Sequence, residues 1–438
     1  MATVIPLEPC YWLKNACVPL SMLQVQDQSI WENQTSEGLC FVDIQVAEGK
    51  VAQIVRANSQ PMGDAAVVNV QGGQVWAGFV DVHTHLDKGH IWQRTPNPEG
   101  TFNQALERVQ QDSLQYWQAE DVYRRMAFGL RCSYAHGTQA IRTHIDSFGE
   151  QAAISFGVFQ QLQQEWANRL VLQAVALVSL DYYLTPEGVK LADLVAEVGG
   201  VLGGVAYMNP EIEAQLDQVF RLAQERDLAL DFHTDETDDP ESICLRKVAE
   251  AARRCQFGRQ IVCGHCCSLA VQSPEDVAET LARVKEAGIG VVSLPLSNLY
   301  LQDRKLGRTP RWRGVTVIQE LLESGIPVTL ASDNCRDPFF GFGDHDVLEV
   351  FNQGVRVAHL DGVYGESPAM VTKTAADLMG LGNVGRIGVG LAANLVWFKG
   401  RSYSELLSRP QCDRVVIRDG IAIDTTLPDY RELDSLGS

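Results

Sequence analysis

The sequence predicts an α/β protein, a (β/α)8 TIM-like barrel with a small β-sandwich domain formed by both chain termini. Three observations lead to this prediction. Short apolar segments alternate with amphipathic segments through the middle of the chain, both ends carry hairpin patterns instead, and histidines gather where the apolar segments end. A chain of 438 residues is long enough for one large barrel and a smaller satellite.

The two ends of the chain have the pattern of short strands joined by turns. Near the N-terminus, "GLCFVDIQVAEGKVAQIV" alternates apolar and polar residues around the turn "EGK". Near the C-terminus, "ANLVWFKG" is followed by "DRVVIRDGIAID", in which "DG" predicts a tight turn. We therefore expect a discontinuous small β domain of residues 1–75 and 388–438, and a barrel domain of residues 76–387.

The middle of the chain predicts eight buried strands that alternate with helices. Helical segments include "PEIEAQLDQVFRLAQERD" and "SPEDVAETLARVKEAG", where Ser273 is expected to cap the helix and Pro274 to begin it. Eight strand–helix units are the pattern of a (β/α)8 barrel. The expected strands are "GFVDVHTH", "AIRTHID", "LVLQAVALV", "VLGGVAYM", "LALDFHTDE", "QIVCGHC", "IGVVSLPL" and "PVTLASDN".

Composition and charge exclude several classes of partner. The formal net charge of −19 repels phosphate backbones and anionic lipid, so we expect neither nucleic acid nor a membrane as partner. The start "MATVIPLEPCYWLKNACVPL" lacks the basic and long apolar parts of a signal peptide, and no run of the chain is apolar enough to span a bilayer. Eleven cysteines without a regular framework then indicate reduced thiols in the cytoplasm. "CGHCC" has no second cysteine pair at a matching distance, which argues against a structural zinc site there.

Polar residues with ligand or catalytic chemistry fall at the ends of the expected strands, where barrels of this kind carry their active sites. In a His-x-His pair, both imidazoles lie on one face of the strand, because side chains alternate with period two. Two such rings, a third imidazole and a carboxylate could hold one divalent ion, whereas a His-x-His pair alone is more often packed or at the surface. Because several strand ends each supply a ligand type, we predict a metal centre. The strand-end residues are His83, His85, His144, Asp146, His233, Glu236, His265 and Asp333.

Other polar residues carry weaker signals. His144 could contact the site or pair with Asp146, and both possibilities stay open. Asp87 and Lys88 are expected to make loop contacts. The remaining histidines share no pattern and are expected to be structural or at the surface: His90, His136, His345 and His359.

From about Gly78 to Val396 the chain resembles the amidohydrolase superfamily, and within it the cytosine-deaminase-like branch. The resemblance implies a barrel whose late segment "GRIGVGLAANLV" returns into the small β domain. It rests on several motifs in their family order: "HTHLD", "RTHID", "FHTDETDD", "CGHCC", "LPLSNLYLQDR", "TPRWRGVTVIQELLESGIPV" and "SDNCRDPF".

The resemblance implies a site with one divalent metal ion, zinc or iron, bound by His83, His85, His233 and Asp333. A divalent metal lowers the pKa of a bound water to about 7. Asp333 would orient this water and accept its proton, and His265 would position it. Glu236 would carry protons to the ring nitrogen and then to the departing amine.

The fourth expected strand, "VLGGVAYM", argues against a second metal ion. Two-metal relatives bridge their ions through a carboxylated lysine or a glutamate on this strand, and this chain has neither residue there. A ring opener of the dihydroorotase type is therefore disfavoured.

Two departures from the cytosine deaminases bear on the substrate. Leu177, Val178 and Ser179 stand where those enzymes have Phe-Pro-Gln, and a serine hydroxyl cannot replace the paired donor and acceptor of an amide. Asn334 stands where they have a second aspartate after the metal ligand. Loss of the reading glutamine predicts poor recognition of cytosine, and Asn334 adds a hydrogen-bond donor and removes a charge.

The loop after the first barrel strand, "KGHIWQRTPNPEGTF", also differs, and it offers Trp92 and Arg94. These residues would suit a larger, bicyclic ring with an acidic or carbonyl substituent, although Trp92 could instead only pack the loop. Together with Leu177, Ser179 and Asn334 they form the expected substrate-binding set.

The sequence thus predicts a metal-dependent hydrolytic deaminase of an amino-substituted N-heterocycle that releases ammonia. Cytosine, isocytosine, isoguanine and pterin-type rings are the candidates. An amidohydrolase that cleaves another C–N or ester bond is the first alternative, and a non-catalytic binding or scaffold barrel is the remote one. A homo-oligomer is possible.

Overall fold

The structure is a computed structural model, and it describes residues 5–6, 8–32, 34–58 and 65–434. Residues 1–4 and 435–438 belong to the expected small β domain, and residues 1–4 also to the segment in which no signal peptide is expected. Both lie outside the described residues. The chain divides into two compact units. The terminal unit holds residues 1–80, 133–140 and 347–427, and the central unit holds residues 81–132, 141–346 and 428–438.

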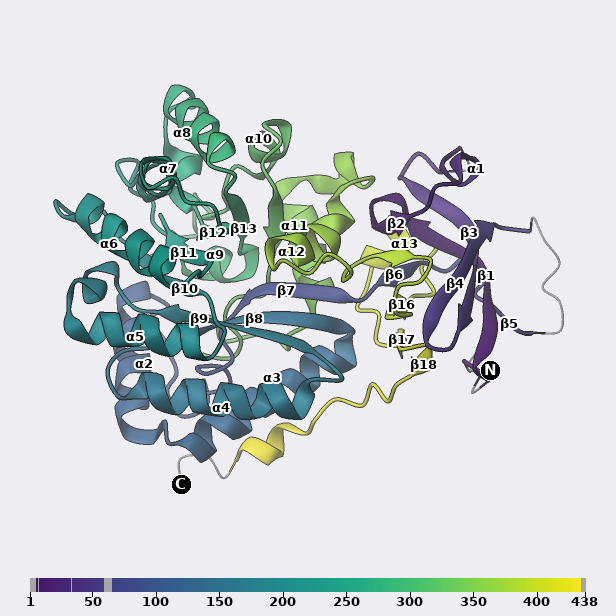
Figure 1. Ribbon diagram of the computed structural model, residues 1–438, viewed down its shortest axis with the longest axis horizontal. Helices are drawn as coiled ribbons and strands as arrows, with labels where there is room; N and C mark the ends of the chain where they lie inside the picture. The colour runs from purple at the N-terminus through teal and green to yellow at the C-terminus, as the bar shows by residue number, and fades with distance from the viewer. Residues whose placement is uncertain (1–4, 7, 33, 59–64, 435–438) are drawn as a thin grey trace. The chain divides into compact units, whose positions relative to one another are not determined.

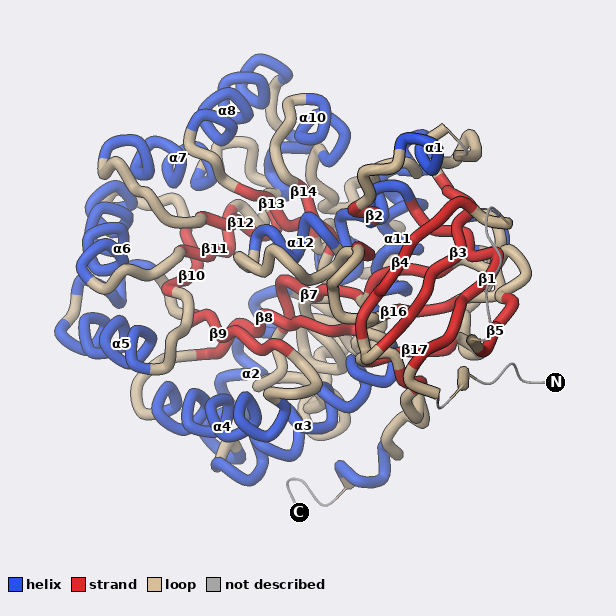
Figure 2. The backbone as a smooth tube through the Cα atoms, turned by 45° about the vertical axis from the view of Figure 1, so that its right-hand side comes forward, coloured by secondary structure: helices blue, strands red, loops and turns tan. Residues whose placement is uncertain are grey.

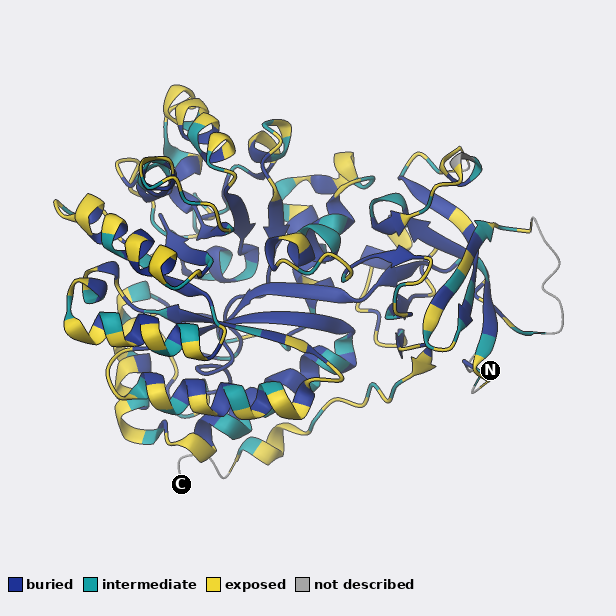
Figure 3. Cartoon of the chain, viewed as in Figure 1, coloured by how far each residue is buried: buried dark blue, intermediate teal, exposed yellow. Residues whose placement is uncertain are grey.

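All eight strands expected in the middle of the chain are present, and β7 to β13 are labelled in Figure 1 and β14 in Figure 2. They form a three-stranded sheet, β7-β8-β9, and a five-stranded parallel sheet, β10-β11-β12-β13-β14. Their short apolar cores are almost wholly buried, as expected for strands covered on both faces (Figure 3). The strands are β7 Phe79–Thr84, β8 Thr138–Asp146, β9 Val171–Leu177, β10 Leu202–Ala206, β11 Leu230–Thr234, β12 Ile261–His265, β13 Gly290–Ser293 and β14 Val328–Leu330.

Isolated bridges extend these two sheets toward each other. Val175 pairs with Val201 and Ser179 with Val205, so β9 runs beside β10 in the parallel sense. At the other edge Thr84 pairs with Asp333, just beyond β14. The eight central strands therefore form two sheets of an α/β fold, linked by isolated bridges at both edges.

Amphipathic helices alternate with the strands and flank them (Figure 2). In α6, the buried Leu216, Val219, Phe220 and Ala223 recur at the spacing of one helical face. In α8, the Ser273 side chain accepts a hydrogen bond from the backbone N–H of Asp276, and the next residue is proline, as the sequence predicts. The helices are α2 Phe102–Tyr116, α3 Ala119–His136, α4 Gln151–Trp166, α5 Pro186–Glu197, α6 Ile212–Glu225, α7 Cys244–Arg254, α8 Pro274–Glu286, α9 Pro295–Leu301 and α10 Ile318–Glu323.

The terminal unit contains the hairpins expected at the chain ends. β3 and β4 pair antiparallel, and the turn between them has positive φ at Glu48 and Gly49. β17 and β18 pair likewise around Asp419 and Gly420, which also have positive φ. Such turns match the right-handed twist of the strands that they join.

These hairpins belong to two four-stranded sheets, β4-β3-β1-β5 and β18-β17-β16-β6. A third pair, β15-β2, joins both ends of the chain. The strands are β1 Cys10–Pro19, β2 Leu23–Gln24, β3 Leu39–Ala47, β4 Lys50–Arg56, β5 Ala66–Asn69, β6 Val75–Ala77, β15 Ile387–Gly388, β16 Leu395–Trp397, β17 Val415–Arg418 and β18 Ile421–Ala422.

The remaining elements are short, except for α11. Among the described residues, no helix is long and apolar enough to cross a membrane. These elements are α1 Gln28–Trp31, α11 Val347–Ala358, α12 Lys373–Leu378, α13 Tyr403–Leu407 and the 3-10 turns η1 Leu20–Met22, η2 Leu180–Leu184, η3 Cys267–Val271, η4 Leu360–Val363, η5 Ser367–Val371 and η6 Tyr430–Leu433.

Candidate active site

Five side chains from four strand ends meet inside the central unit, and we call them the histidine cluster. Each lies at or just beyond the carboxyl end of its strand, so parallel strands bring them to the same edge. All five are buried. The cluster consists of His83, His85, His233, His265 and Asp333.

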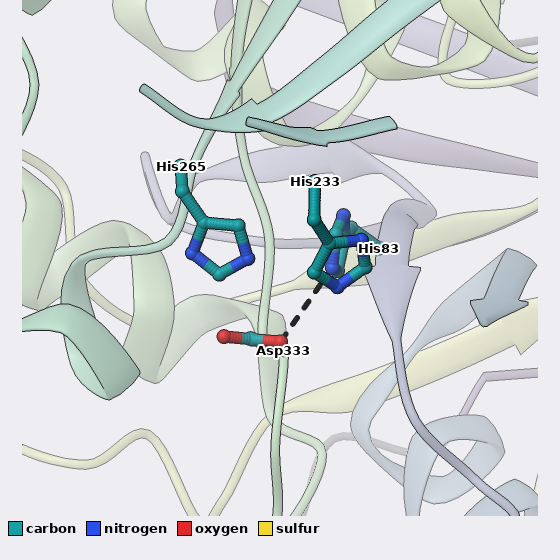
Figure 4. Close-up of side chains that lie close together, drawn as sticks. All are labelled: His83, His233, His265 and Asp333. Carbon is teal, nitrogen blue, oxygen red and sulfur yellow. Dashed lines mark ion pairs between the residues drawn. The ribbon is translucent and has the colours of Figure 1, made fainter. Parts of the chain in front are cut away.

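The distances within the histidine cluster are short. The Nε2 of His85 lies 3.1 Å from the Asp333 Oδ1, and the Nε2 of His83 lies 3.5 Å from the same oxygen. The Nε2 atoms of His85 and His233 are 3.4 Å apart. Figure 4 shows the rings of His83 and His233 above the Asp333 carboxylate, with His265 beside them. Donor atoms of His83, His233, His265 and Asp333 all lie within 4.8 Å of one another, which is the compactness that one ion requires.

Local sequence makes this convergence possible. In the parallel register His233 on β11 lies opposite Gly264 on β12, and a Cβ at Gly264 would come within 2.9 Å of the His83 ring. Only glycine leaves that space. His265 and Asp333 both adopt positive φ, 68° and 61°, a conformation that non-glycine residues rarely take outside turns and functional sites.

Burial keeps the imidazoles neutral. It lowers the pKa of His83 well below its usual value, and the nearby His144 and His85 add to the effect. The pKa of His233 falls in the same way, through burial and then the charges of His83 and His265. Neutral imidazoles keep the lone pair that a metal needs.

Asp333 is buried among these histidines, and it remains ionised. Burial alone would raise its pKa, but the hydrogen bond with His85 and the nearby His265 outweigh burial, and the pKa is lowered. The cluster therefore combines neutral nitrogen donors with one carboxylate.

Polar atoms of the histidine cluster lack hydrogen-bond partners among the described residues. Neither ring nitrogen of His83 has one, nor does the Nε2 of His265. A buried polar group without a partner costs about 1–3 kcal/mol, so natural proteins seldom keep one without a ligand. The donor types, their burial and their missing partners fit a divalent metal ion.

Glu236 and His265 form a pair beside the cluster. The Glu236 Oε1 lies 3.4 Å from the Nδ1 of His265, and its side chain is 15% exposed. The Asn298 side-chain amide donates to the Glu236 Oε1 at 3.2 Å and lies 3.1 Å from the His265 Nδ1. Burial, followed by the charge of Asp333, raises the pKa of Glu236 well above its usual value, whereas Lys88 opposes this. A protonated Glu236 can donate a proton, and Asn298 fixes its position.

Burial also lowers the pKa of His265, to about 4, although Asp333 opposes this. His265 is therefore neutral at pH 7. Its Nδ1 faces Glu236 and Asn298, whereas its Nε2 has no hydrogen-bond partner among the described residues.

The expected substrate residues on β9 and β14 lie at strand ends. Leu177 ends β9 half-buried, and Ser179 follows two residues later in an exposed position. Asn334 is buried, and its side-chain amide donates to the Asp337 carboxylate at 2.8 Å. Whether these three residues contact substrate stays a prediction.

Trp92 and Arg94 have other partners in the loop after β7. Trp92 is half-buried and packs over Gly341, where an added Cβ would lie 3.1 Å from its ring. Arg94 donates to the carboxylates of Asp112 and Asp121. The geometry supports packing for Trp92 and does not favour a substrate contact for Arg94, and both substrate roles stay predictions.

Arg94 belongs to a set that we call the arginine cluster, together with Asp112, Asp121 and Arg125. Arg125 donates from Nε to Asp121 at 2.8 Å. Asp112 lies on α2, and Asp121 and Arg125 lie on α3, so the cluster holds the loop after β7 against both helices.

Sequence reasoning missed two residues at this site. Asn298 lies on α9, which places it beside His265 in the folded chain. The only signal in the sequence was an isolated amide within the apolar "LPLSNLYL". Lys88 was expected to make only loop contacts, and its Nζ does donate to Asp146 at 2.8 Å. It is nevertheless buried, and its charge lowers the pKa of Glu236.

His144, left open by the sequence, contacts the histidine cluster. Its ring centroid lies 3.9 Å from that of His83, and its Nε2 is 3.8 Å from the Asp231 carboxylate. It is fully buried.

Comparison with known proteins gives consistent matches. The sequence profile of the amidohydrolase family matches residues 119–422. A pterin deaminase of Rhizobium rhizogenes is 49% identical over 405 residues, which cover 92% of each chain.

Solved structures of similar proteins support a TIM-barrel-like α/β fold. The 5-methylcytosine deaminase from Klebsiella pneumoniae superposes with a TM-score of 0.80 at 26% identity, over 94% of this chain and 97% of that one. A guanine deaminase from C. acetobutylicum matches with a TM-score of 0.66 at 13% identity, over 95% of this chain and 99% of that one, and shows the fold alone.

Proposed function

This chain belongs to the amidohydrolase family and is a hydrolytic deaminase of an N-heterocycle, and we propose that its substrate is a pterin. A pterin is a bicyclic ring whose C2 carries an exocyclic amine. The observation that carries this proposal is the 49% identity to a pterin deaminase along nearly the whole chain. The replacement of the Phe-Pro-Gln segment by Leu177, Val178 and Ser179 supports it, because the cytosine-reading amide is missing.

Deaminases of this family bind a metal, and we assign one zinc or iron ion to His83, His85, His233 and Asp333. Zinc–ligand bonds of about 2.0–2.2 Å in a tetrahedron place neighbouring donor atoms roughly 3.3 Å apart. The donor atoms of these residues are 3.1, 3.4 and 3.5 Å apart in the pairs His85–Asp333, His85–His233 and His83–Asp333. These three separations support the assignment of the four residues to one ion, and we assign His265, which lies in the compact donor group with His83, His233 and Asp333, to the reacting water.

When bound, a divalent ion lowers the pKa of a water to about 7 and so supplies a nucleophile at neutral pH. Asp333 is ionised, and it accepts the proton of the water that attacks C2. His265 is neutral, and through its Nε2 it orients the oxygen of that water. A new C–O bond forms at C2 as the π bond between C2 and the ring nitrogen is lost, and the ring stays closed.

Glu236 acts as the general acid and base that transfers protons to and from the substrate. It donates its proton to the ring nitrogen beside C2 when water adds. It then takes a proton from the added hydroxyl and delivers it to the exocyclic amine, and the proton that Asp333 took from the water restores the acid form of Glu236. The C2–N bond breaks, ammonia leaves, and the 2,4-dioxopteridine remains. Asn298 holds the Glu236 carboxyl within reach of these atoms.

Substrate selection is assigned to the residues around the strand ends. Leu177 and Ser179 would line the side of the ring that cytosine deaminases read with an amide. Asn334, held by Asp337, would present a neutral group where those enzymes have a charge. Trp92 would limit the pocket from the loop after β7.

A substrate panel with a purified, metal-loaded protein tests this function. We expect pterin to release ammonia with a higher kcat/KM than cytosine, 5-methylcytosine, isocytosine, guanine or isoguanine. Glu236→Gln should lower kcat on pterin by about 10²–10⁴-fold, the usual contribution of a general acid–base group. Glu241→Gln, an exposed acid five positions further along, is the control and should keep wild-type turnover. If cytosine were preferred over pterin, the substrate assignment would be wrong.

We also propose the finer organisation that the sequence predicts. The bridges at both sheet edges support closure of β7 to β14 into one barrel over residues 76–387. The two four-stranded sheets would form a β-sandwich of residues 1–75 and 388–438. We expect the protein to work in the cytoplasm, without nucleic-acid or membrane partners, and to form a homo-oligomer. Light scattering of the purified chain tests the last point.

A further inference from the structure

A second group of metal-ligand side chains lies in the central unit outside the proposed catalytic residues. It consists of His90, Cys335 and His345, and we call it the thiol cluster. Donor atoms of all three lie within 4.8 Å of one another, and all three residues are buried. The proposed function uses none of them.

The two imidazoles of the thiol cluster face each other at close range. The Nε2 atoms of His90 and His345 are 3.1 Å apart, and the ring centroids are 5.2 Å apart. Two nitrogen ligands of one tetrahedral zinc ion stand about 3.3 Å apart, because each Zn–N bond is about 2.0–2.1 Å. A thiolate ligand at about 2.3 Å stands roughly 3.6 Å from each nitrogen, so the 4.8 Å limit on the three atoms accommodates it.

The backbone brings these side chains together from two loops. The backbone N–H of His90, in the loop after β7, donates to the carbonyl of Cys335, in the loop after β14, at 3.1 Å. His90 and His345 both have positive φ, 65° and 56°. Rarely adopted backbone conformations at two histidines that meet indicate a constraint on where their rings point.

The neighbouring helix leaves room for the cluster. A Cβ at Gly129 of α3 would come within 2.9 Å of the His345 Nε2, so a larger residue would displace that ring. Phe128, one residue earlier, packs edge-on against the ring of His90. The pocket is therefore shaped around the two imidazoles.

A hydrogen bond between the two imidazoles accounts for only part of this arrangement. It leaves Cys335 as a free buried thiol within reach of both rings. A mixed imidazole and thiolate donor set is the one that zinc prefers among common divalent ions.

We propose that His90, Cys335 and His345 bind a second divalent metal ion of the zinc type. This ion joins the loop that follows His85 to the loop that follows Asp333. It therefore holds in place the two segments that carry donors of the histidine cluster. Its role is structural, and it is distinct from the ion assigned to the histidine cluster.

Cobalt titration of the metal-free full-length chain tests this proposal. The histidine cluster offers only imidazoles and a carboxylate, so a thiolate-to-cobalt charge-transfer band in the near ultraviolet reports only the thiol cluster. We expect the wild type to bind two equivalents of Co²⁺, one of which produces this band, and Zn²⁺ to abolish it. Cobalt binding without the band, whether one or two equivalents are bound, would overturn the proposal.

Variants assign the band to its ligands. Cys335→Ser should lose the band and one equivalent of metal. Cys132→Ser is the matched control, since Cys132 is also a buried thiol of the central unit but lies outside the cluster, and it should keep both. If Cys335→Ser kept the band and Cys132→Ser lost it, Cys335 would not be a ligand of this ion.

His90→Gln is a second variant that tests metal binding by the thiol cluster, and it does not depend on whether Cys335→Ser folds. It should keep the circular dichroism of the wild type, lose one metal equivalent and weaken the band. Retention of two equivalents would contradict the assignment of His90. Neither measurement uses the deaminase assay, so a failure of the proposed function leaves this test intact.

Discussion

The histidine cluster and the arginine cluster are both buried in the central unit, and they differ in how well their polar groups are satisfied. Arg94 alone makes four hydrogen bonds to Asp112 and Asp121. In the histidine cluster, by contrast, the His83 ring nitrogens lack hydrogen-bond partners among the described residues. Paired charges stabilise a fold, whereas unsatisfied donors and acceptors are free to bind a ligand.

The comparison predicts opposite consequences for mutations in the two clusters. Changes in the histidine cluster should remove activity at little cost in stability, because few intramolecular bonds are lost. Changes in the arginine cluster should remove stability and leave the chemistry intact. The predictions below run from the largest expected effect to the smallest.

Asp333→Asn should lower kcat/KM on pterin by at least about 10³-fold, since it removes both the proposed base and a proposed ligand. The urea midpoint of the metal-free protein should stay constant or rise, because the variant no longer buries an ionised carboxylate. Asp193→Asn, a 62% exposed aspartate on α5, is the control and should change the free energy of unfolding by less than about 0.5 kcal/mol. A large loss of stability in Asp333→Asn without loss of activity would reverse the comparison.

Arg94→Met should destabilise the protein by about 3 kcal/mol, because it leaves the buried carboxylates of Asp112 and Asp121 without their main partner. Its kcat/KM on pterin should remain close to that of the wild type. Lys399→Met, which breaks an exposed ion pair with Asp413, is the control and should cost less than about 1 kcal/mol. A tenfold rise in KM with unchanged stability would instead make Arg94 a substrate-binding residue.

Sequence periodicity predicted the elements that surround the histidine cluster. All eight central strands are confirmed, because short buried runs between amphipathic helices leave little choice of structure. Period-two alternation correctly placed His83 and His85 together, and strand ends correctly placed His233 and Asp333 beside them. Their roles as ligands stay predictions.

Positions fixed by loops could not be predicted in the same way. His90 and His345 were expected to be unrelated structural or surface residues, and the structure places them 3.1 Å apart. Arg94 was expected at the substrate because it follows an active-site strand, but its partners lie on α2 and α3. These side-chain contacts depend on the conformation of the loops, which no periodic pattern in the sequence predicts.

The pH dependence of the free energy of unfolding tests the comparison of the two clusters at one carboxylate, that of Asp121. Burial would raise the pKa of Asp121, but hydrogen bonds from Arg94 and the charge of Arg125 outweigh burial, and the pKa is lowered. The folded state therefore takes up this proton less readily than the unfolded chain, whose aspartates have a pKa of about 3.9. The stabilisation that results is complete above that pH and is lost as the pH falls through the lower pKa of the folded state.

Arg94→Met removes much of this stabilisation. The deficit in its free energy of unfolding against the wild type should therefore be constant above about pH 5, and it should narrow below about pH 4, where the wild type loses the same stabilisation. Urea midpoints of both proteins across this range measure the deficit, with Lys399→Met as the exposed control. A deficit that widens in acid would show that Asp121 is stabilised in its protonated form. The arginine cluster would then resemble the histidine cluster, with a carboxylate that its partners do not fully satisfy.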